Sequence, residues 1–320
     1  MKSFIFIILL FIVFGCSSPI KVNASTKTLT NKHQSSITKS NWNHGSENCK
    51  TNQDPVFDVY KHDANSFILR QNKCLTFEAP FIYILVGEQK ILVLDTGALS
   101  NKPELSLYTE LEKLIGKEQL TVKQVLVVHS HGHSDHYKGD MYFEERSNVK
   151  LIKTSAADVR QFFGFTDWPQ GQTTIDLGER KVTVLPTPGH QEEAISLYDH
   201  QTKWLMTGDT LYPGYIYVKN WQAYRNSIAR LATFASHNDV TAILGAHIEK
   251  KNQAAEFFPI GSTYQPNEAK LDLSVQSLQI LNTKLTTMDE SNELIFDDFI
   301  IKPMSSFQKI LSNAARWFTQ

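Results

Sequence analysis

The sequence predicts a mixed α/β domain, and three observations support this fold class. Short apolar runs typical of buried strands alternate with longer segments that carry apolar residues at helical spacing. Some of these runs are joined in pairs by short polar turns, which adds hairpins to the alternation. Polar residues that can bind metals follow several of the runs directly. Because ligands of α/β folds gather beyond the carboxyl ends of strands, we expect a functional site at one edge of the sheets.

The composition fits a folded domain and argues against two classes of function. Hydrophobic residues make up 41% and charged residues 20% of the chain, as in many globular proteins. The net charge of -1 provides neither the basic surface of a nucleic-acid-binding protein nor the acidic excess of a disordered one. We therefore expect a small-molecule substrate and no nucleic acid. The composition leaves the oligomeric state open.

The first residues differ in character from the rest of the chain. An apolar run over residues 4–14 is too short to span a bilayer and is typical of a secretory signal. It ends in Gly15-Cys16, which resembles the lipobox of bacterial lipoproteins and implies acylation of the Cys16 thiol. We predict a signal peptide over residues 1–15 and a lipid anchor that holds the protein extracytoplasmically on the bacterial membrane, facing the periplasm. The alternative is a signal peptide that is cleaved without lipidation, giving a secreted or periplasmic protein.

Residues 16–54 are rich in Ser, Thr, Asn and Lys and poor in apolar residues, which predicts a flexible polar tether. Cys49 and Cys74 could pair in an oxidising compartment, or both could remain free thiols. We expect the folded domain to cover residues 55–252. A mostly helical extension over residues 253–320 is expected to pack on it.

The predicted secondary structure follows from the apolar patterns. Predicted strands cover residues 67–69, 81–86, 91–94, 125–128, 150–152, 181–185, 194–198, 204–206 and 240–244. Predicted helices cover residues 103–117, 156–163 and 221–234. In the first of these helices, Pro103 suits the first turn and Gly116 marks the end.

The densest chemical motif directly follows the predicted strand over residues 125–128. Within six residues it brings together four side chains that can bind metals: His131, His133, Asp135 and His136. Imidazole nitrogens and carboxylate oxygens are ligands of zinc, iron and manganese. Three further candidates follow later predicted strands: His190, Asp209 and His247. Strand ends that converge on one edge would assemble all seven side chains into one site.

These motifs, preceded by Asp95-Thr96-Gly97 after an earlier strand, occur in the order of the metallo-β-lactamase superfamily of hydrolases, which residues 56–250 resemble. The resemblance implies a four-layer αββα sandwich with a metal site at one edge of its two sheets. It also implies two divalent metal ions, zinc or alternatively iron or manganese. The first ion would be held by His131, His133 and His190. The second would be held by Asp135, His136 and His247, with Asp209 bridging the two.

A centre of this kind makes hydroxide available at neutral pH and polarises a carbonyl or phosphoryl oxygen. Asp135 and Asp209 are predicted catalytic residues because their charges partly balance those of the ions. Tyr212 occupies a position at which the related acyl-homoserine lactonases carry a tyrosine that stabilises the substrate carbonyl. Its phenol could donate to an oxyanion, or its ring could pack beside Pro213. Asp95 either orients a ligand histidine or caps its strand.

The predicted activity is hydrolysis of an ester-like bond by this hydroxide, with a thioester or a lactone favoured. The sequence carries no cysteine near the motifs, which argues against lactamases that use a thiolate ligand. His133 stands where the diiron flavoprotein relatives carry a glutamate. The open alternatives are a β-lactam or phosphodiester hydrolase, an iron sulfur-dioxygenase, and a non-catalytic metal-binding lipoprotein. Four aromatic residues could wall the substrate pocket or pack in the core: Tyr215, Tyr217, Trp221 and Tyr224.

Overall fold

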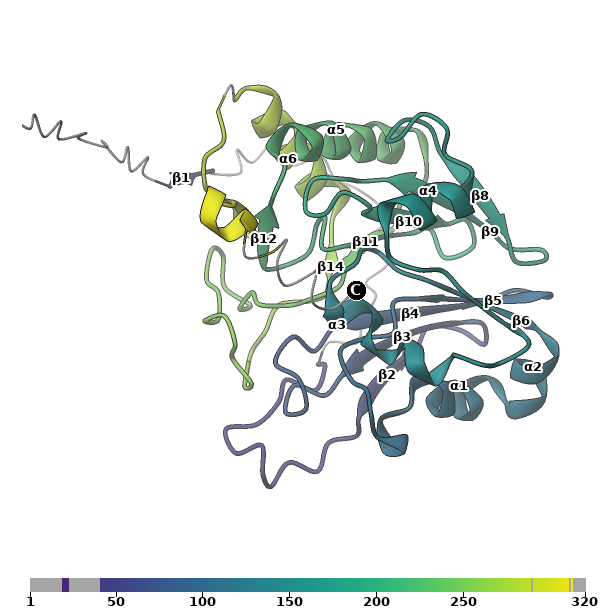
Figure 1. Cartoon of the computed structure of the whole chain (residues 1–320). Coiled ribbons are helices and arrows are strands. Elements are labelled where there is room, and N and C mark those ends of the chain that lie inside the picture. Colours follow the sequence, from purple (N-terminus) through teal and green to yellow (C-terminus); the bar gives the residue numbers. More distant parts are fainter. Residues whose placement is uncertain (1–18, 23–40, 289, 311, 313–320) are drawn as a thin grey trace, which may run out of the picture.

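Two six-stranded sheets lie face to face between two layers of helices (Figure 1). This computed structural model describes residues 19–22, 41–288, 290–310 and 312. The predicted signal peptide and the candidate lipidation site Cys16 lie outside the described residues. The four layers confirm the predicted αββα fold class.

The first sheet is built from the first half of the domain. In spatial order it contains β2 (Phe57–Lys61), β3 (Ser66–Gln71), β4 (Phe81–Val86), β5 (Lys90–Leu94), β6 (Gln124–Val128) and β7 (Val149–Leu151). The second sheet contains β14 (Asp272–Leu273), β13 (Ala242–Gly245), β11 (Trp204–Gly208), β10 (Ile195–Asp199), β9 (Lys181–Pro186) and β8 (Thr173–Asp176). The predicted hairpins are present, since β4 pairs antiparallel with β5, and β10 with β11.

Strand direction brings the motifs to one edge. β5 and β6 are parallel, so their carboxyl ends share an edge of the first sheet. In the second sheet, β9 and β11 both run antiparallel to β10, and β13 is parallel to β11. The carboxyl ends of β9, β11 and β13 therefore also share an edge, as ligand sites of α/β folds require.

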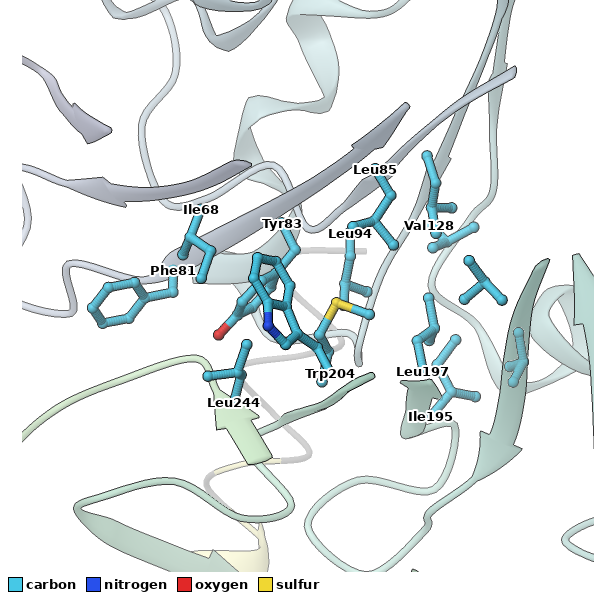
Figure 2. Close-up of a cluster of buried hydrophobic side chains, with 14 of the residues drawn as sticks. Ile68, Phe81, Tyr83, Leu85, Leu94, Val128, Ile195, Leu197, Trp204 and Leu244 are labelled. Carbon is cyan, nitrogen blue, oxygen red and sulfur yellow. The ribbon is translucent and has the colours of Figure 1, made fainter. Parts of the chain in front are cut away.

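Side chains of both sheets interlock between them to form the central core (Figure 2). Ile68 and Tyr83 of the first sheet face Trp204 and Leu244 of the second (Figure 2). Successive side chains of a strand point to opposite faces, so the neighbouring Ile82 turns outward and packs in the cluster beneath the helices. Both faces of each sheet are covered, which explains the nearly continuous apolar runs of the strands.

Helices cover the outer faces of the sheets. Beside the first sheet lie η1 (Pro103–Leu105), α1 (Leu107–Ile115) and α2 (Lys117–Val122). Over the second sheet lie α5 (Trp221–His237) and α6 (Val275–Thr286). The helix predicted over residues 103–117 is divided, because Pro103 begins a short 3₁₀ helix and Ser106 then caps α1. Gly116, with φ of 91°, ends α1 as predicted.

The remaining helices lie at or near the edge that carries the motifs. They are α3 (Ser134–Tyr137), η2 (Lys138–Tyr142) and α4 (Ala156–Phe163). The short α3 belongs to the histidine-rich motif itself.

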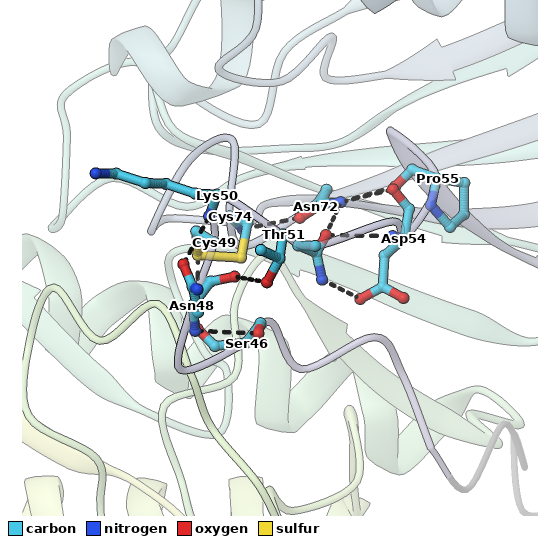
Figure 3. The surroundings of a disulfide bond; sticks show 10 residues. Ser46, Asn48, Cys49, Lys50, Thr51, Asp54, Pro55, Asn72 and Cys74 are labelled. Atoms are coloured by element: carbon cyan, nitrogen blue, oxygen red, sulfur yellow. Dashed lines mark hydrogen bonds between the residues drawn. A yellow bond between two sulfur atoms is a disulfide. The ribbon is translucent and has the colours of Figure 1, made fainter.

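Residues 41–54, here called the N-terminal arm, pack against the domain. Trp42 is buried, and its ring lies 4.9 Å from that of Phe81. Cys49 forms a disulfide with Cys74, with their Cα atoms 5.0 Å apart (Figure 3). Part of the tether predicted over residues 16–54 therefore packs on the domain. A polar composition conceals the one buried tryptophan and the disulfide that fix the arm.

The segment after residue 252 is less helical than predicted. Its described residues contain α6 and three short strands: β14, β15 (Leu294–Ile295) and β16 (Ile300–Pro303). β14 extends the second sheet, and α6 buries Leu278, Leu281 and Leu285 in the cluster beneath α5. A third sheet has the order β1-β15-β16-β12, where β1 covers Ile20–Lys21 and β12 covers Tyr215–Val218. The domain boundaries near residues 55 and 252 stay predictions.

Over the part of the chain that the structure describes, no helix combines the length and apolarity needed to cross a bilayer.

Candidate metal centre

The seven candidate ligands converge at the shared edge of the two sheets. They form two groups, within each of which the possible ligand atoms lie within 4.8 Å of one another. The first group contains His131, His133, His190 and Asp209. The second contains Asp135, His136 and His247. The structure thus brings together the residues that the sequence selects.

The loops that carry these residues have little freedom. Gly189 precedes His190 and has φ of 148°, and a Cβ at this position would lie 2.5 Å from the Cα of Tyr224 in α5. A side chain there would displace the loop after β9. Close packing against α5 therefore fixes where His190 enters the site.

In the first group the imidazole nitrogens point at one another. His133 Nδ1 lies 3.0 Å from His131 Nε2 and 3.1 Å from His190 Nε2. A tetrahedral zinc ion bound at its usual distance from nitrogen would hold such atoms about 3.3 Å apart. Asp209 Oδ2 lies 3.6 Å from His131 Nε2 and 3.5 Å from His190 Nε2. The spacing of the four atoms fits a tetrahedral metal site.

The second group surrounds the other oxygen of Asp209. Asp135 Oδ2 lies 3.3 Å from Nε2 of both His136 and His247. Asp209 Oδ1 lies 3.6 Å from His136 Nε2 and 3.3 Å from His247 Nε2. Asp209 therefore presents one carboxylate oxygen to each group, the arrangement that a bridging ligand requires.

Backbone carbonyls fix the orientation of two of the imidazoles. His190 Nδ1 donates to the carbonyl of Tyr217 at 2.7 Å, and His247 Nδ1 donates to the carbonyl of Glu78 at 3.0 Å. A carbonyl only accepts, so in the neutral imidazole the proton is on Nδ1. The lone pair of Nε2 then faces the centre, as ligation requires.

Asp95 performs the corresponding role for His136. Its Oδ2 accepts from His136 Nδ1 at 2.9 Å, and its Oδ1 accepts from the backbone N–H of Ser130 at 2.7 Å. Asp95 follows β5 with φ of 68°, and its side chain is buried. Of the two roles that the sequence leaves open for Asp95, the structure shows the orientation of a candidate ligand.

His133 is held differently from the other histidines. Its Nδ1 faces the centre, and its Nε2 lies 2.7 Å from the side-chain amide of Gln191. Gln191 is buried and directly follows His190 in the chain. Sequence reasoning missed Gln191, because a single glutamine carries no motif of its own. Its NH₂ group, which only donates, contacts the outward edge of the His133 ring, and its oxygen accepts from Lys219.

The electrostatics of the centre call for cations. Burial and neighbouring imidazoles lower the pKa of His131, and they lower the pKa of His133 to about 3. Burial opposes ionisation of Asp135 and Asp209, but nearby histidines outweigh it and hold the pKa of both carboxyls well below the usual value. His131 and His133 are thus neutral imidazoles beside the ionised carboxylate of Asp209, and these are the protonation states of metal ligands.

Two buried atoms lack hydrogen bonds at the point where the groups meet. His136 Nε2 and Asp209 Oδ1 make no hydrogen bond with any described residue. Buried polar atoms are nearly always satisfied, so this pair needs an explanation. A divalent ion accounts for both atoms, and the donor set of imidazoles and carboxylates suits zinc, iron or manganese. The residues of the site therefore fit a metal centre.

A cavity of about 210 Å³ opens over the two groups. Two of the four aromatic residues proposed as pocket walls, Tyr215 and Tyr217, line it. The other two, Trp221 and Tyr224, belong to the hydrophobic cluster beneath α5 instead. Glu78 and Glu249 also line the cavity, and the sequence gives no signal for Glu78.

Tyr212 lies in the cavity wall with its ring centroid 5.4 Å from that of His247. Its hydroxyl donates to the carbonyl of Tyr215. Burial and nearby carboxylates raise its pKa well above the usual value, so the phenol keeps its proton. Because that single proton is already donated, an oxyanion would have to compete with the Tyr215 carbonyl for it. The predicted catalytic role of Tyr212 stays a prediction.

Comparison with known proteins agrees with the fold and the site. The model of the metallo-beta-lactamase superfamily matches residues 75–247, which contain all seven candidate ligands. The chain belongs to the metallo-beta-lactamase superfamily. It is a metallo-hydrolase of this superfamily, as the sequence predicts.

The relatives include proteins named as an acyl-coenzyme A thioesterase and as a hydroxyacylglutathione hydrolase. The chain is 27% identical over 221 residues to "Acyl-coenzyme A thioesterase MBLAC2" of Homo sapiens, a match that covers 57% of this chain and 77% of that protein. It is 34% identical over 83 residues to a hydroxyacylglutathione hydrolase of Brucella ovis, covering 26% of this chain and 32% of the relative. Among solved structures, a metallo-beta-lactamase from Pontibacter korlensis matches with a TM-score of 0.48 and 16% identity, over 72% of this chain and all of the other.

Proposed function

We propose that this protein is a dinuclear metallo-hydrolase that cleaves thioesters. The observation that supports it most strongly is Asp209, whose two oxygens face two separate groups of candidate ligands. The choice of a thioester rests on the similarity to a protein named as an acyl-coenzyme A thioesterase.

We infer that the first ion is bound by the group of His131 and the second by the group of His136, with Asp209 between them. Zinc is the proposed metal, since imidazole and carboxylate ligands in a tetrahedral arrangement suit it. Bound divalent ions supply positive charge that lowers the pKa of water and polarises a carbonyl oxygen. The negative charges of Asp135 and Asp209 partly balance that charge.

The residues around the ligands hold the centre in place. Asp95 and the carbonyls of Tyr217 and Glu78 orient three imidazoles, so little rearrangement is needed when the ions bind. Tyr215 and Tyr217 wall the cavity in which a substrate would lie. An aromatic wall beside a few polar groups is typical of small-molecule sites.

The test is a set of initial rates with zinc-loaded and chelated protein on thioester, lactone, β-lactam and phosphodiester substrates. We expect a chelator-sensitive rate that is highest on thioesters, and we expect Asp209→Ala to abolish it. Val122→Ser is the matched control, because Val122 is 76% exposed on α2. A highest rate on another class would replace the proposed substrate. No rate on any class, with metal bound, would favour a dioxygenase or a non-catalytic binding protein.

An iron sulfur-dioxygenase is the alternative with the clearest structural consequence. It would use one ion and leave Asp135 and His247 without metal. In the structure His247 Nε2 lies 3.3 Å from Asp135 Oδ2 within the second group, which supports a second ion instead. The number of ions per chain separates the two activities.

We propose that the protein works outside the cytoplasm, held at the membrane through a lipid on Cys16. The disulfide between Cys49 and Cys74 supports an oxidising compartment. Expression of Cys16→Ser in a bacterial host tests the anchor. We expect the variant to move from the membrane fraction to the soluble extracytoplasmic fraction. Wild-type protein that is already soluble would point to a signal peptide that is cleaved without lipidation.

A further inference from the structure

The cavity over the metal centre has an apolar side that the metal chemistry does not use. Phe77, Ile260 and Met304 line it, and they come from three separate segments of the chain. Phe77 is 43% exposed and Ile260 is 62% exposed. Single exposed apolar residues are ordinary, but these two line one and the same cavity. Apolar surface in this position favours an apolar ligand.

The charged groups that line the cavity also favour an apolar ligand over an anionic one. The carboxyl-bearing lining residues of the cavity are Glu78, Glu249, Asp135 and Asp209, and no lysine or arginine among the described residues lines it. An anionic group in the apolar part would lose its hydration and find no cationic side chain to replace it. A neutral, apolar group has no such hydration to lose when it enters the apolar part of the cavity.

The N-terminal arm braces both walls of the cavity. The disulfide of Cys49 with Cys74 ties the arm to the loop that carries Phe77. On the other side, Gly45 forms a β-bridge with Tyr264, in the loop that carries Ile260. The disulfide and the β-bridge fix the positions of the two walls before any ligand enters. A wall that is already in place reduces the ordering cost of binding.

The backbone of the Phe77 loop has a further tie. Lys73 Nζ donates to the carbonyl of Phe77 at 2.8 Å. Lys73 is almost completely buried, so its position depends on the packing of the loop. This hydrogen bond fixes the backbone position of the exposed Phe77, as expected of a residue that binds a ligand.

We propose that Phe77, Ile260 and Met304 form a subsite for the neutral, apolar acyl chain of the substrate. This inference rests on the proposed thioester hydrolysis and names the half of the substrate that the cavity selects. In that reaction water forms a C–O bond with the acyl carbon while the C–S bond breaks. The products are the carboxylic acid and the thiol, which takes a proton of the water.

The volume of the cavity limits how much of the acyl chain it can enclose. At about 210 Å³ it is smaller than the roughly 300–1,000 Å³ of pockets that enclose drug-sized ligands. It therefore holds the reacting carbonyl and the first part of the chain, and a longer chain extends along Phe77 and Ile260 at the opening. Each methylene buried there should raise kcat/KM about three- to fourfold until the chain passes the opening.

The experiment uses acetyl, butyryl, hexanoyl, octanoyl and succinyl thioesters of N-acetylcysteamine with the zinc-loaded protein. We expect kcat/KM to rise along the neutral series, and the succinyl thioester to fall at least about tenfold below the butyryl thioester. Ile260→Asp and Phe77→Ser should each reduce the ratio of octanoyl to acetyl kcat/KM by about tenfold, mainly through KM. Val122→Ser should keep the wild-type ratio.

Binding of the matching S-alkyl thioethers, which cannot be hydrolysed, separates the subsite from the reaction. Affinity that rises with chain length and falls in Ile260→Asp supports the subsite even if no thioester is turned over, in which case only the proposed reaction fails. Thioester turnover without dependence on chain length, in wild type and variants alike, overturns the subsite and leaves the reaction intact.

Discussion

Asp95 acts on the centre through His136 and does not belong to either candidate metal group. Its two oxygens also accept from the backbone N–H and the hydroxyl of Ser130, at 2.7 and 2.9 Å, at the start of the histidine-rich loop. One buried carboxylate thus fixes both a candidate ligand and the loop that carries it. Residues of this kind can influence a metal site almost as strongly as the ligands themselves.

Asp95→Asn should weaken zinc binding by about 10–100-fold, because an amide has one accepting oxygen and cannot replace both oxygens of the carboxylate. The measurement is competition for zinc against a chromophoric chelator. The unfolding transition of the metal-free variant is recorded beside it, to separate weaker binding from loss of fold. Unchanged zinc affinity in a folded variant would show that His136 needs no such support.

Among single residues, the sequence selects side chains that the structure brings together, but it does not indicate their hydrogen-bond partners. His131 and Asp209 could be identified because they lie in motifs that directly follow predicted strands. The contact of Gln191 with His133, and of the Glu78 carbonyl with His247, arises only when distant loops meet in the fold. A backbone carbonyl in particular leaves no trace in the sequence.

A buried ion pair joins the two sheets at the edge opposite the metal centre. Arg180, just before β9, makes two hydrogen bonds with Asp199 at the end of β10, at 2.9 and 2.7 Å. The same guanidinium donates to the carbonyl of Asn65, in the turn between β2 and β3, at 2.7 Å and to the carbonyl of Val86, at the end of β4, at 3.2 Å. One side chain therefore connects elements of both sheets.

Arg180→Ala should lower the free energy of unfolding by about 3–5 kcal/mol, since it leaves Asp199 buried without its partner. Chemical denaturation of the metal-free protein measures the loss. Lys113→Ala is a suitable comparison, because the pair of Lys113 with Glu110 on α1 is more exposed and should contribute at most about 1 kcal/mol. Equal losses in the two variants would contradict the account of the buried pair.

The pH dependence of stability provides a separate test of Asp199. Burial alone would raise its pKa, but hydrogen bonds and charge from Arg180, with further bonds from Thr202, lower the pKa below the usual value. A lowered folded pKa stabilises the protein above the unfolded pKa of about 3.9 and loses this contribution as pH falls through the folded value. The stability difference between wild type and Asp199→Asn should therefore shrink below about pH 4. A difference that grows on acidification would contradict the lowered pKa.

Elements with strong periodicity and clear end signals could be predicted from the sequence. α1 is one example, since Gly116 ends it where expected. The packed N-terminal arm could not be predicted from the sequence, because its position depends on Trp42 and on a disulfide between cysteines that are 25 residues apart. β14 and β15 have only two residues each, too few for a periodic pattern.

At the scale of the whole molecule, the metal centre joins the two sheets. One candidate group includes residues from the loop after β6 in the first sheet, and from the loops after β9 and β11 in the second. Ions bound there would link the two halves of the sandwich. The mixed α/β class could be predicted from the alternation of apolar runs and helical segments, whereas the four αββα layers are implied by the resemblance of the motifs to a known family.

Metal removal should therefore lower the thermal stability of the protein. A ligand that binds only the folded state adds about 4 kcal/mol when its free concentration is a thousand times its Kd. We expect the chelated protein to unfold several degrees below the zinc-loaded protein, with a difference that depends on zinc concentration. Identical transitions at all zinc concentrations would show that these residues bind no zinc in the folded state.

The central claim is that two ions act together, with Asp209 between them. The most direct measurement is a zinc titration of the metal-free protein, recording bound zinc and thioester hydrolysis in the same samples. Two ions per chain, with activity that reaches its maximum only when the second has bound, is the predicted result. Full activity at one ion per chain, unaffected by replacing His247 with Ala, would contradict it.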